Sequence, residues 1–339
     1  MSGIADPKTI KQTILRALRG ALLARESATK AELSRVTGVS FPTVSKFLTE
    51  MEASGEVRAV GLDRSSGGRR AGRYAYNPQF MLGLALYLER TETNVLVFDC
   101  RGEPVERVVS GSVLTDGVER LHELIEAVLR KHPRIRSLSI GVPAAVSGGR
   151  IIYIPDYERF QGLDVKGSCE ARFALPVVVE NDMNAAVFGY SKRRAGDSGG
   201  SLVYLYFGQN GPGAGLLING QVVRGSTHFA GEVSFVPQYD SRSFREALRG
   251  GDAADPVCRL IAAYAAIVNP EAVVFSDEEV GAALLDRIRE GSSAYIPAEH
   301  LPKLIVSGWK DDYLYGLQSL GLEAMIARAG DAAGEAEGE

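Results

Sequence analysis

Residues 29–48 read Thr29-Lys-Ala-Glu-Leu-Ser-Arg-Val-Thr-Gly38-Val-Ser-Phe-Pro-Thr-Val-Ser-Lys-Phe-Leu48 and predict two short helices joined at a glycine. Gly38 can adopt the positive φ that ends the first helix. Ser40 is a preferred N-cap for the second helix, and Pro42 is tolerated in its first turn because the N–H it lacks would have no partner there. The helical period predicts one buried face on each helix, formed by Ala31, Leu33, Val36, Val44, Phe47, Leu48 and Met51. This layout is typical of a helix-turn-helix, whose second helix enters the major groove of DNA.

DNA contacts are expected from the other face of the second helix and from a basic loop that follows it. The side chains that point away from the buried face are Ser40, Phe41, Thr43, Ser45 and Lys46. Strand-like segments at 55–60 and 73–76 flank a glycine-rich loop, which is the order of a winged helix-turn-helix. The wing arginines expected to reach phosphates or the minor groove are Arg64, Arg69, Arg70 and Arg73. An ordinary αα-hairpin is the alternative for residues 29–48, but it leaves the winged segment unexplained.

Charge is divided unevenly along the chain, whose net charge is −4. Residues 1–78 hold 13 Lys and Arg against 7 Asp and Glu, a net of +6, whereas residues 79–339 hold 25 against 35, a net of −10. A basic head on an acidic body indicates a polyanion as partner. We therefore expect residues 1–78 to form a winged helix-turn-helix domain that binds double-stranded DNA.

The composition restricts the class of protein. A chain of 339 residues with 45% hydrophobic content can build two or three substantial cores. The sequence has no apolar run of about 18 residues and no signal peptide, so we expect a cytoplasmic protein without membrane spans. The three cysteines, Cys100, Cys169 and Cys258, are far apart, which argues against disulfides and against a metal site. The small, acidic tail at 330–339 is expected to be disordered.

The body of the chain alternates strands and helices. Strands are predicted at 81–88, 94–99, 136–142, 175–180, 201–207, 213–218 and 272–275. Helices are predicted at 121–129, directly after Asn181, at 259–268 and at 313–329. This alternation indicates an α/β fold with two lobes, at 79–190 and 191–329.

Several motifs of the body resemble those of the ROK family, which contains sugar kinases and sugar-responsive transcriptional repressors. The matching segments are Gly141-Val-Pro143, Pro176-Val-Val-Val-Glu-Asn-Asp-Met-Asn-Ala-Ala186, Gly213-Ala-Gly-Leu-Leu-Ile-Asn-Gly220, Arg224-Gly225, Ala230-Gly-Glu232 and Asn269-Pro-Glu-Ala-Val-Val274. The head resembles the winged helix-turn-helix of the family's repressor branch, including Ser66-Gly-Gly-Arg-Arg70. The resemblance implies a two-lobed actin-like ATPase fold behind a DNA-binding head.

A candidate ligand site follows the strand at 175–180. Asn181 and Asp182 stand where this strand ends, and open α/β sheets bind ligands at such strand ends. An amide and a carboxylate together donate and accept hydrogen bonds, as sugar hydroxyls require. The alternative is that both residues only cap the next helix. The resemblance implies that the position of Asp182 is the general base of the kinases, while the positions of Asn181 and Glu232 hold sugar hydroxyls. We therefore expect an effector site at Asn181, Asp182 and Glu232.

The sequence departs from the kinase pattern where the family holds nucleotide. The family's kinases begin the body with an Asp-x-Gly-Gly-Thr loop, whose backbone N–H groups reach the phosphates. Here residues 83–91 place Ala85 at the aspartate position, bulky Tyr87 and Leu88 at the glycines, and Glu89 where it would repel phosphate. Phosphoryl transfer depends on that cradle, so we expect no catalytic residue and no cofactor.

A second departure concerns zinc, which the family binds with a Gly-Glu-x-x-His motif and a following cysteine cluster. The histidine position is Phe235 here, and residues 236–250 contain no cysteine. Zinc needs three or four nitrogen or sulfur ligands, so no metal is expected. The same change replaces a sugar-contacting imidazole with an aromatic ring.

Three functions remain open on these residues. The first is a transcriptional regulator, a repressor, that binds operator DNA as a homodimer or larger homo-oligomer and senses a sugar or sugar-phosphate in the body. The second is an active sugar kinase with a DNA-binding head, against which the lost phosphate loop speaks. The third is an effector-independent regulator whose body serves only for dimerisation.

Overall fold

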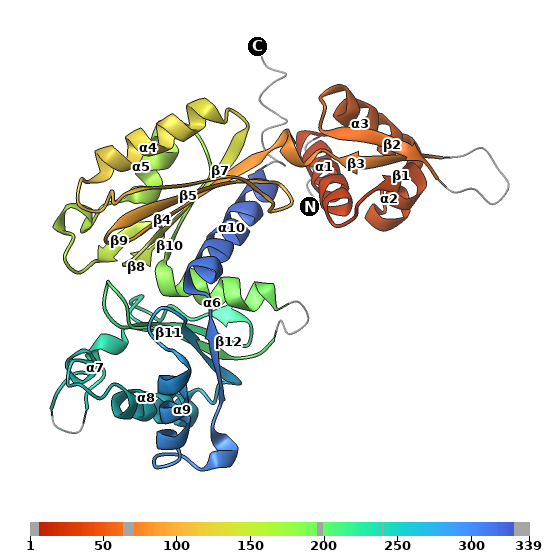
Figure 1. Ribbon diagram of the computed structural model, residues 1–339. Coiled ribbons are helices and arrows are strands. Elements are labelled where there is room, and N and C mark those ends of the chain that lie inside the picture. Colours follow the sequence, from red (N-terminus) through yellow and green to blue (C-terminus); the bar gives the residue numbers. More distant parts are fainter. Residues whose placement is uncertain (1–6, 64–70, 195–198, 239–240, 329–339) are drawn as a thin grey trace, which may run out of the picture.

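The computed structural model describes residues 7–63, 71–194, 199–238 and 241–328. A small head of helices and a three-stranded sheet precedes two α/β lobes, each built on a five-stranded sheet (Figure 1). The alternation of strands and helices confirms the predicted α/β class. The predicted tail at 330–339 and the wing residues 64–70 lie outside the described residues.

The head consists of three helices and a short antiparallel sheet of order β1-β3-β2. Its elements are α1 (Pro7–Leu23), β1 (Ala28–Thr29), α2 (Lys30–Thr37), α3 (Phe41–Ala53), β2 (Val57–Leu62) and β3 (Gly72–Tyr76). The Thr29 side chain and the Glu32 carboxylate form a capping box at the start of α2. Gly38 ends α2 with φ +70°, as its position in the sequence predicts. The helix-turn-helix and the two wing strands are therefore present in the expected order.

Two details of the head differ from the sequence-based expectation. Leu33 is buried, but Ala31 is exposed and Val36 is 48% exposed. Because α2 is only eight residues long, its buried face holds a single large side chain. Ser40 occupies the N-cap of α3 without a side-chain cap, and its hydroxyl instead lies 2.8 Å from that of Thr43.

The first lobe contains a sheet of order β10-β7-β4-β5-β6. Its strands are β4 (Leu82–Leu88), β5 (Glu92–Asp99), β6 (Pro104–Gly111), β7 (Ile135–Val142) and β10 (Val177–Asn181). All seven residues of β4 are buried, because the helices α4 (Val118–Lys131) and α5 (Val165–Phe173) cover one face and α10 (Trp309–Arg328) packs on the other. A small hairpin, β8 (Ala145–Ser147) and β9 (Arg150–Tyr153), stands beside β10.

The second lobe contains a sheet of order β13-β12-β11-β14-β15. Its strands are β11 (Leu202–Tyr206), β12 (Gly213–Ile218), β13 (Gln221–Val222), β14 (Ala272–Ser276) and β15 (Lys303–Ser307). The helices α8 (Ala254–Ile267) and α9 (Ala282–Ser292) belong to its outer core, and α6 (Asp182–Arg193) lies on the inner face. The sequence did not predict β6, β15, α5 or α9. The predicted lobe boundary at 190 falls inside α6, and it stays a prediction.

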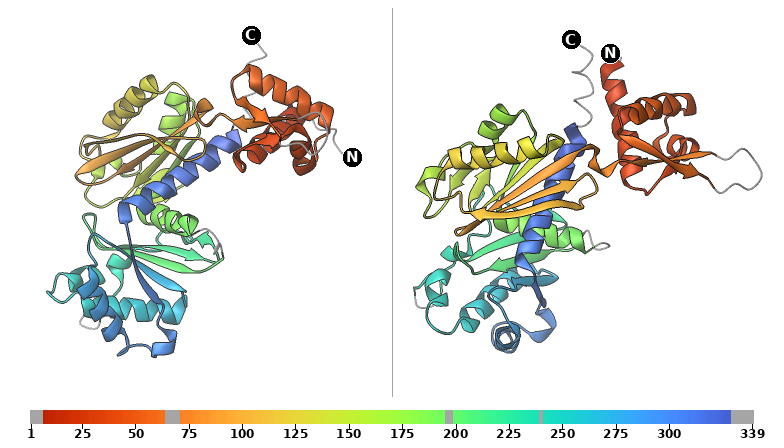
Figure 2. Two further views of the ribbon diagram at one scale, coloured as in Figure 1. Left: turned by 45° about the vertical axis from the view of Figure 1, so that its right-hand side comes forward. Right: turned by 45° about the horizontal axis from the view of Figure 1, so that its top comes forward.

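Helices α6 and α10 pack on each other between the two sheets (Figure 1). A Cβ atom placed on Gly316 would lie 1.9 Å from the Ala185 carbonyl oxygen, and one on Gly189 would lie 2.0 Å from that of Asp312. The two backbones therefore touch, with no room for a side chain between them. Both views in Figure 2 show α10 (blue) running from the second lobe past the first lobe to the head.

Gly316→Ala should lower the stability of the body by about 3 kcal/mol, because the added methyl meets backbone atoms that cannot rotate away. Gly20→Ala is the matched control, since Gly20 lies inside α1 with nothing within 4 Å of an added Cβ. It should raise stability by up to about 1 kcal/mol through helix propensity. Thermal unfolding followed by circular dichroism measures both changes. Equal melting temperatures for the two variants would show that α6 and α10 are not in backbone contact.

Candidate functional site

The candidate DNA surface is the outer side of α3. Ser40, Phe41 and Lys46 are exposed there, and Thr43 and Ser45 are half-buried. The Phe41 ring is 52% exposed, so its apolar face is available for contact with a thymine methyl group. Lys30 donates a 2.9 Å hydrogen bond to the Ser45 hydroxyl, which adds a cation from α2 to this surface. Four of the five predicted residues lie on α3 and Ser40 is its N-cap. Their contact with DNA stays a prediction.

Arg73 is the predicted wing arginine that lies within the described residues. Its guanidinium donates 3.0 Å hydrogen bonds to the Ser27 hydroxyl and carbonyl and to the Asp63 carboxylate, and it also pairs with Glu32 at 3.2 Å. These contacts tie β3 to α2 and to the end of β2. Arg73 therefore holds these segments of the head together. A phosphate contact from its guanidinium stays a prediction. The remaining wing arginines, Arg64, Arg69 and Arg70, lie outside the described residues.

The candidate effector site is a cavity at the corner where β10 ends and α6 begins. Both lobes line it, and its walls include Pro143, Tyr153, Asn181, Asp182, Glu232 and Phe235. The structure thus brings the three predicted effector residues into one cavity. Binding of an effector by them stays a prediction.

Asn181 has both of the roles that its sequence position suggests. Its side-chain oxygen accepts a hydrogen bond from the Asn184 N–H at 3.0 Å and so caps α6. Its amide nitrogen donates to the Ala144 carbonyl at 3.0 Å and to Asp182 Oδ1 at 2.9 Å. Since every one of these contacts is internal, the cap fixes the side chain at the cavity wall.

The two acidic residues of the cavity hold their protons more strongly than usual. Burial raises the pKa of Asp182 well above its ordinary value, and the nearby carboxylates of Glu89 and Glu232 raise it further. Burial also raises the pKa of Glu232. Sugar hydroxyls can form hydrogen bonds with these carboxyls in either protonation state.

Glu180 is a residue of this corner that the sequence did not single out. One of its carboxylate oxygens accepts hydrogen bonds from the Asn181 N–H at 3.0 Å and the Asn184 amide at 3.1 Å, and the other pairs with Arg224. It therefore orders the residues on both sides of the corner. Its position next to Asn181 in the motif could have indicated a role at this corner. Nothing in the sequence spacing shows that Arg224 is its partner.

Phe235 lies at the mouth of the cavity, where its ring is 56% exposed and 5.3 Å from the ring of Phe229. His228 lines the same cavity, and its buried Nδ1 has no hydrogen-bond partner among the described residues. Within the described ranges, no group of three His, Cys, Asp or Glu side chains is placed to hold a metal ion.

The position of the kinase phosphate loop is filled by side chains. Strand β4 runs straight through Ala85, Tyr87 and Leu88, and the Tyr87 ring stacks on that of Tyr313 at 4.8 Å. At the tip of the β4–β5 hairpin, Glu89 is only 2% exposed. Backbone N–H groups of β4 are engaged with β5 and β7 instead of facing an open loop. A nucleotide phosphate would meet a packed strand and a carboxylate there.

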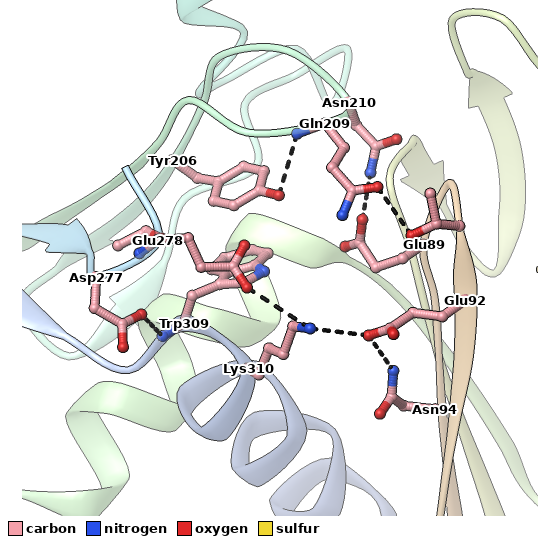
Figure 3. A network of polar contacts seen from close by, with 12 residues as sticks. Glu89, Glu92, Asn94, Tyr206, Gln209, Asn210, Asp277, Glu278, Trp309 and Lys310 are labelled. Atoms are coloured by element: carbon pink, nitrogen blue, oxygen red, sulfur yellow. Dashed lines mark hydrogen bonds and ion pairs between the residues drawn. The ribbon is translucent and has the colours of Figure 1, made fainter. Parts of the chain in front are cut away.

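A network of polar contacts joins the two lobes at this place (Figure 3). Asn210 of the second lobe donates a 2.9 Å hydrogen bond to Glu89. Lys310, at the start of α10, pairs with Glu92 of β5 at 3.0 Å and with Glu278 of the second lobe at 3.7 Å. We call these five residues the interlobe network. Sequence reasoning named Glu89 only as a repulsive group, because the other four become neighbours only when the lobes are placed together.

Burial raises the pKa of Glu89 to about 7, although the hydrogen bond from Asn210 lowers it. Its Oε1 atom is buried without a partner in the described structure. In contrast, the Lys310 ammonium lowers the pKa of Glu92. The interlobe network therefore holds one carboxyl that favours its neutral form beside one that favours its charged form.

Comparison with known proteins finds a family match over part of the chain. Residues 84–242 match the model of the ROK family. The xylose repressor of Bacillus subtilis (strain 168) is 24% identical over 240 residues, which are 68% of this chain and 62% of that protein. The chain thus spans about three fifths of the length of the curated repressor it matches.

Solved structures show the same fold. A ROK family transcriptional regulator, described as a homologue of the E. coli MLC protein, matches 95% of this chain and 98% of its own, with a TM-score of 0.69 and 16% identity. The ROK family glucokinase from Streptomyces griseus in complex with glucose and AMPPNP matches 71% of this chain and 99% of its own, with a TM-score of 0.58 and 21% identity. The predicted fold, a helix-turn-helix head on a two-lobed ROK body, is confirmed. No helix among the described residues has the length and apolar character needed to cross a membrane.

Glu89→Gln should stabilise the chain more at pH 8 than at pH 5. The Glu89 carboxyl ionises near pH 4.5 when unfolded but near pH 7 when folded, so its contribution to stability is lost as the pH rises between these values. This difference between the folded and unfolded pKa values corresponds to about 3 kcal/mol of lost folding stability above pH 7. Glutamine keeps an oxygen for Asn210 and does not titrate. Denaturant unfolding at both pH values measures the effect.

Glu92→Gln is the control for this pH dependence. Lys310 lowers the pKa of Glu92, so its charged form stabilises the fold above its unfolded pKa. This variant should lose stability at pH 8 and much less at pH 4. If the parent and Glu89→Gln showed the same pH profile, Glu89 would ionise as an exposed carboxyl does.

Proposed function

We propose that the chain is a DNA-binding transcriptional regulator, a repressor, whose body senses a sugar-like effector and does not phosphorylate it. The observation that carries the proposal is the helix-turn-helix head on a ROK domain whose phosphate-loop position is filled by buried Tyr87 and Glu89. The matched relative from B. subtilis, named a xylose repressor, agrees with this function. Because a single winged helix covers one half-site, we propose that the chain acts as a homodimer or larger homo-oligomer, in the cytoplasm where its DNA is.

The effector site proposed for this regulator is the corner of Asn181, Asp182 and Glu232. These residues supply two carboxyls and the amide oxygen of Asn181, which accepts one internal hydrogen bond and can accept a second, to one cavity that suits sugar hydroxyls. Phe235 and Tyr153 add exposed aromatic faces at the mouth of the cavity, 56% and 40% exposed. A sugar ring can pack its apolar face on such surfaces.

Helix α10 supports coupling between this cavity and the head. Two residues at its start contact the second lobe. The Trp309 N–H donates to Asp277 at 3.1 Å, and Lys310 pairs with Glu278 at 3.7 Å. Its middle touches α6, which begins at Asp182 in the effector cavity. Near its end, the Ala327 carbonyl accepts a 3.0 Å hydrogen bond from Arg16 of α1. Lobes of hinge-type folds close around ligands. A movement of α6 or of the second lobe would therefore be transmitted to the head through one continuous helix.

Lys46→Ala should weaken binding to the preferred duplex and reduce the slope of log affinity against log salt by about 1, because one phosphate contact is lost. The duplex comes from in vitro selection of random DNA with the full chain, and fluorescence anisotropy at several salt concentrations gives the slope. Lys131→Ala is the control, since Lys131 is an exposed cation on α4 that pairs with Glu106. If both variants gave the parent's slope, α3 would not be the recognition helix.

A sugar kinase is the second candidate, because Asn181 and Asp182 remain in place at the corner. The filled phosphate-loop position argues against it, since phosphoryl transfer depends on positioning and charge stabilisation of the phosphates. Purified chain with magnesium and ATP should therefore convert neither glucose, xylose nor N-acetylglucosamine above the rate of a blank. Turnover that disappears on Asp182→Asn would establish the kinase and overturn the proposal.

A further inference from the structure

The effector cavity has an unpaired cation on the wall formed by the second lobe. Arg245 lies on α7 (Phe244–Leu248) and lines the cavity together with Asn181, Asp182 and Glu232. Its guanidinium packs over Gly211, where an added Cβ would be 3.6 Å from Arg245 Cζ. No hydrogen bond or ion pair engages this guanidinium within the described residues. The other arginine that lines the cavity, Arg224, pairs with Glu180.

Local structure holds Arg245 at this wall. Ser243 and Glu246 form a capping box at the start of α7. The Phe244 N–H donates to the Val236 carbonyl at 2.7 Å, and the Phe244 side chain is fully buried. Helix α7 is thus fixed beside the segment that carries Phe235, so an ordered backbone presents the guanidinium to the cavity.

Two acidic side chains line the same cavity. Asp182 and Glu232 have raised pKa values because of burial, and neither forms an ion pair with Arg245. A ligand that contacts both kinds of group would therefore place hydroxyls against the carboxyls and a negatively charged acceptor against the guanidinium. His228 lines the same cavity, and its buried Nδ1 has no partner among the described residues, which offers a second nitrogen to an anionic group.

We propose that the effector is an acidic sugar, whose carboxylate or phosphate pairs with Arg245 while its hydroxyls contact Asn181, Asp182 and Glu232. This inference rests on the proposed function, since it names the ligand of the same cavity. A neutral pentose, which the name of the B. subtilis relative indicates for that protein, would leave Arg245 unpaired. A planar guanidinium binds carboxylate and phosphate through two parallel N–H donors, which gives the site its preference.

The experiment compares matched neutral and acidic sugars on the full chain by calorimetry and thermal shift. The pairs are glucose with glucuronate, galactose with galacturonate, and glucose with glucose 6-phosphate; inorganic phosphate alone is the anion control. At least one acidic member should bind ten-fold or more tightly than its neutral partner, because charge-assisted hydrogen bonds are about twice as strong as neutral ones. The uronates and the phosphate distinguish the two sources of the charge.

Arg245→Ala should remove most of that preference, with roughly a ten-fold or larger loss of affinity for the acidic sugar and little change for the neutral one. Arg245→Gln keeps much of the side chain's size and should show the same loss, while its unliganded melting temperature shows that the chain still folds. Arg249→Ala is the control, since Arg249 lies at the end of the same helix, is exposed and is not part of the cavity wall.

Four results would overturn the inference. They are equal binding of neutral and acidic members in every pair, an unchanged preference in Arg245→Ala, binding of inorganic phosphate as tight as that of the sugars, and absence of binding by every member of the panel. Binding of the parent and of Arg245→Ala to the selected duplex is measured in parallel. Intact DNA binding with no acidic preference would reject the acidic effector and leave the proposed DNA-binding function standing.

Discussion

The backbone contact between α6 and α10 is the constraint on which the arrangement of the body depends. Gly189 and Gly316 let the two helices meet without side chains between them, so the lobes share one central pair of helices. One helix of the pair begins at the candidate effector cavity, and the other ends beside α1 of the head. Because closely packed helices move together, a shift of α6 at the cavity would displace α10 and so the part of it that contacts the head.

The interlobe network fills the region between the two lobes with hydrogen bonds and ion pairs. In a kinase of this fold the gap between lobes must admit phosphates, which need N–H donors and cations. Here Glu89 and Glu92 of the first lobe face Glu278, and Lys310 is shared between two of these carboxylates. The same contacts that repel phosphate also tie the lobes together. The proposed loss of catalysis and the proposed regulatory role would then have one physical origin.

The sequence alone predicted the parts of the fold that depend on local periodicity. The helix-turn-helix with Gly38 at its turn, the strand that ends at Asn181 and the cap at α6 follow from patterns within a few residues, and all are present. Strand β6 was missed because most of its residues are exposed at the sheet edge and give no apolar signal. The helical period predicted that Val36 is buried. The period does not show how little of the short α2 is covered by the rest of the head.

Features that depend on distant segments could not be predicted in this way. Arginine side chains often contact phosphates. The guanidinium of Arg73, however, is bound by Ser27, Glu32 and Asp63, which only the folded head brings together. The pairing of Glu180 with Arg224 and the approach of Arg245 to the cavity likewise join segments that are far apart in the sequence. The residue types of the candidate site were visible in the sequence, and their partners were not.

We propose that DNA bound by the head and a ligand bound in the cavity act on one connected structure. Coupling of this kind is reciprocal, so DNA must affect the cavity if the cavity affects DNA binding. Hydrogen–deuterium exchange of the full chain with and without its selected duplex tests this directly. We expect slower exchange in α2 and α3 together with altered exchange at the end of α10 and at the β10–α6 corner. Changes confined to the head, with the corner exchanging as in the free protein, would contradict the claim.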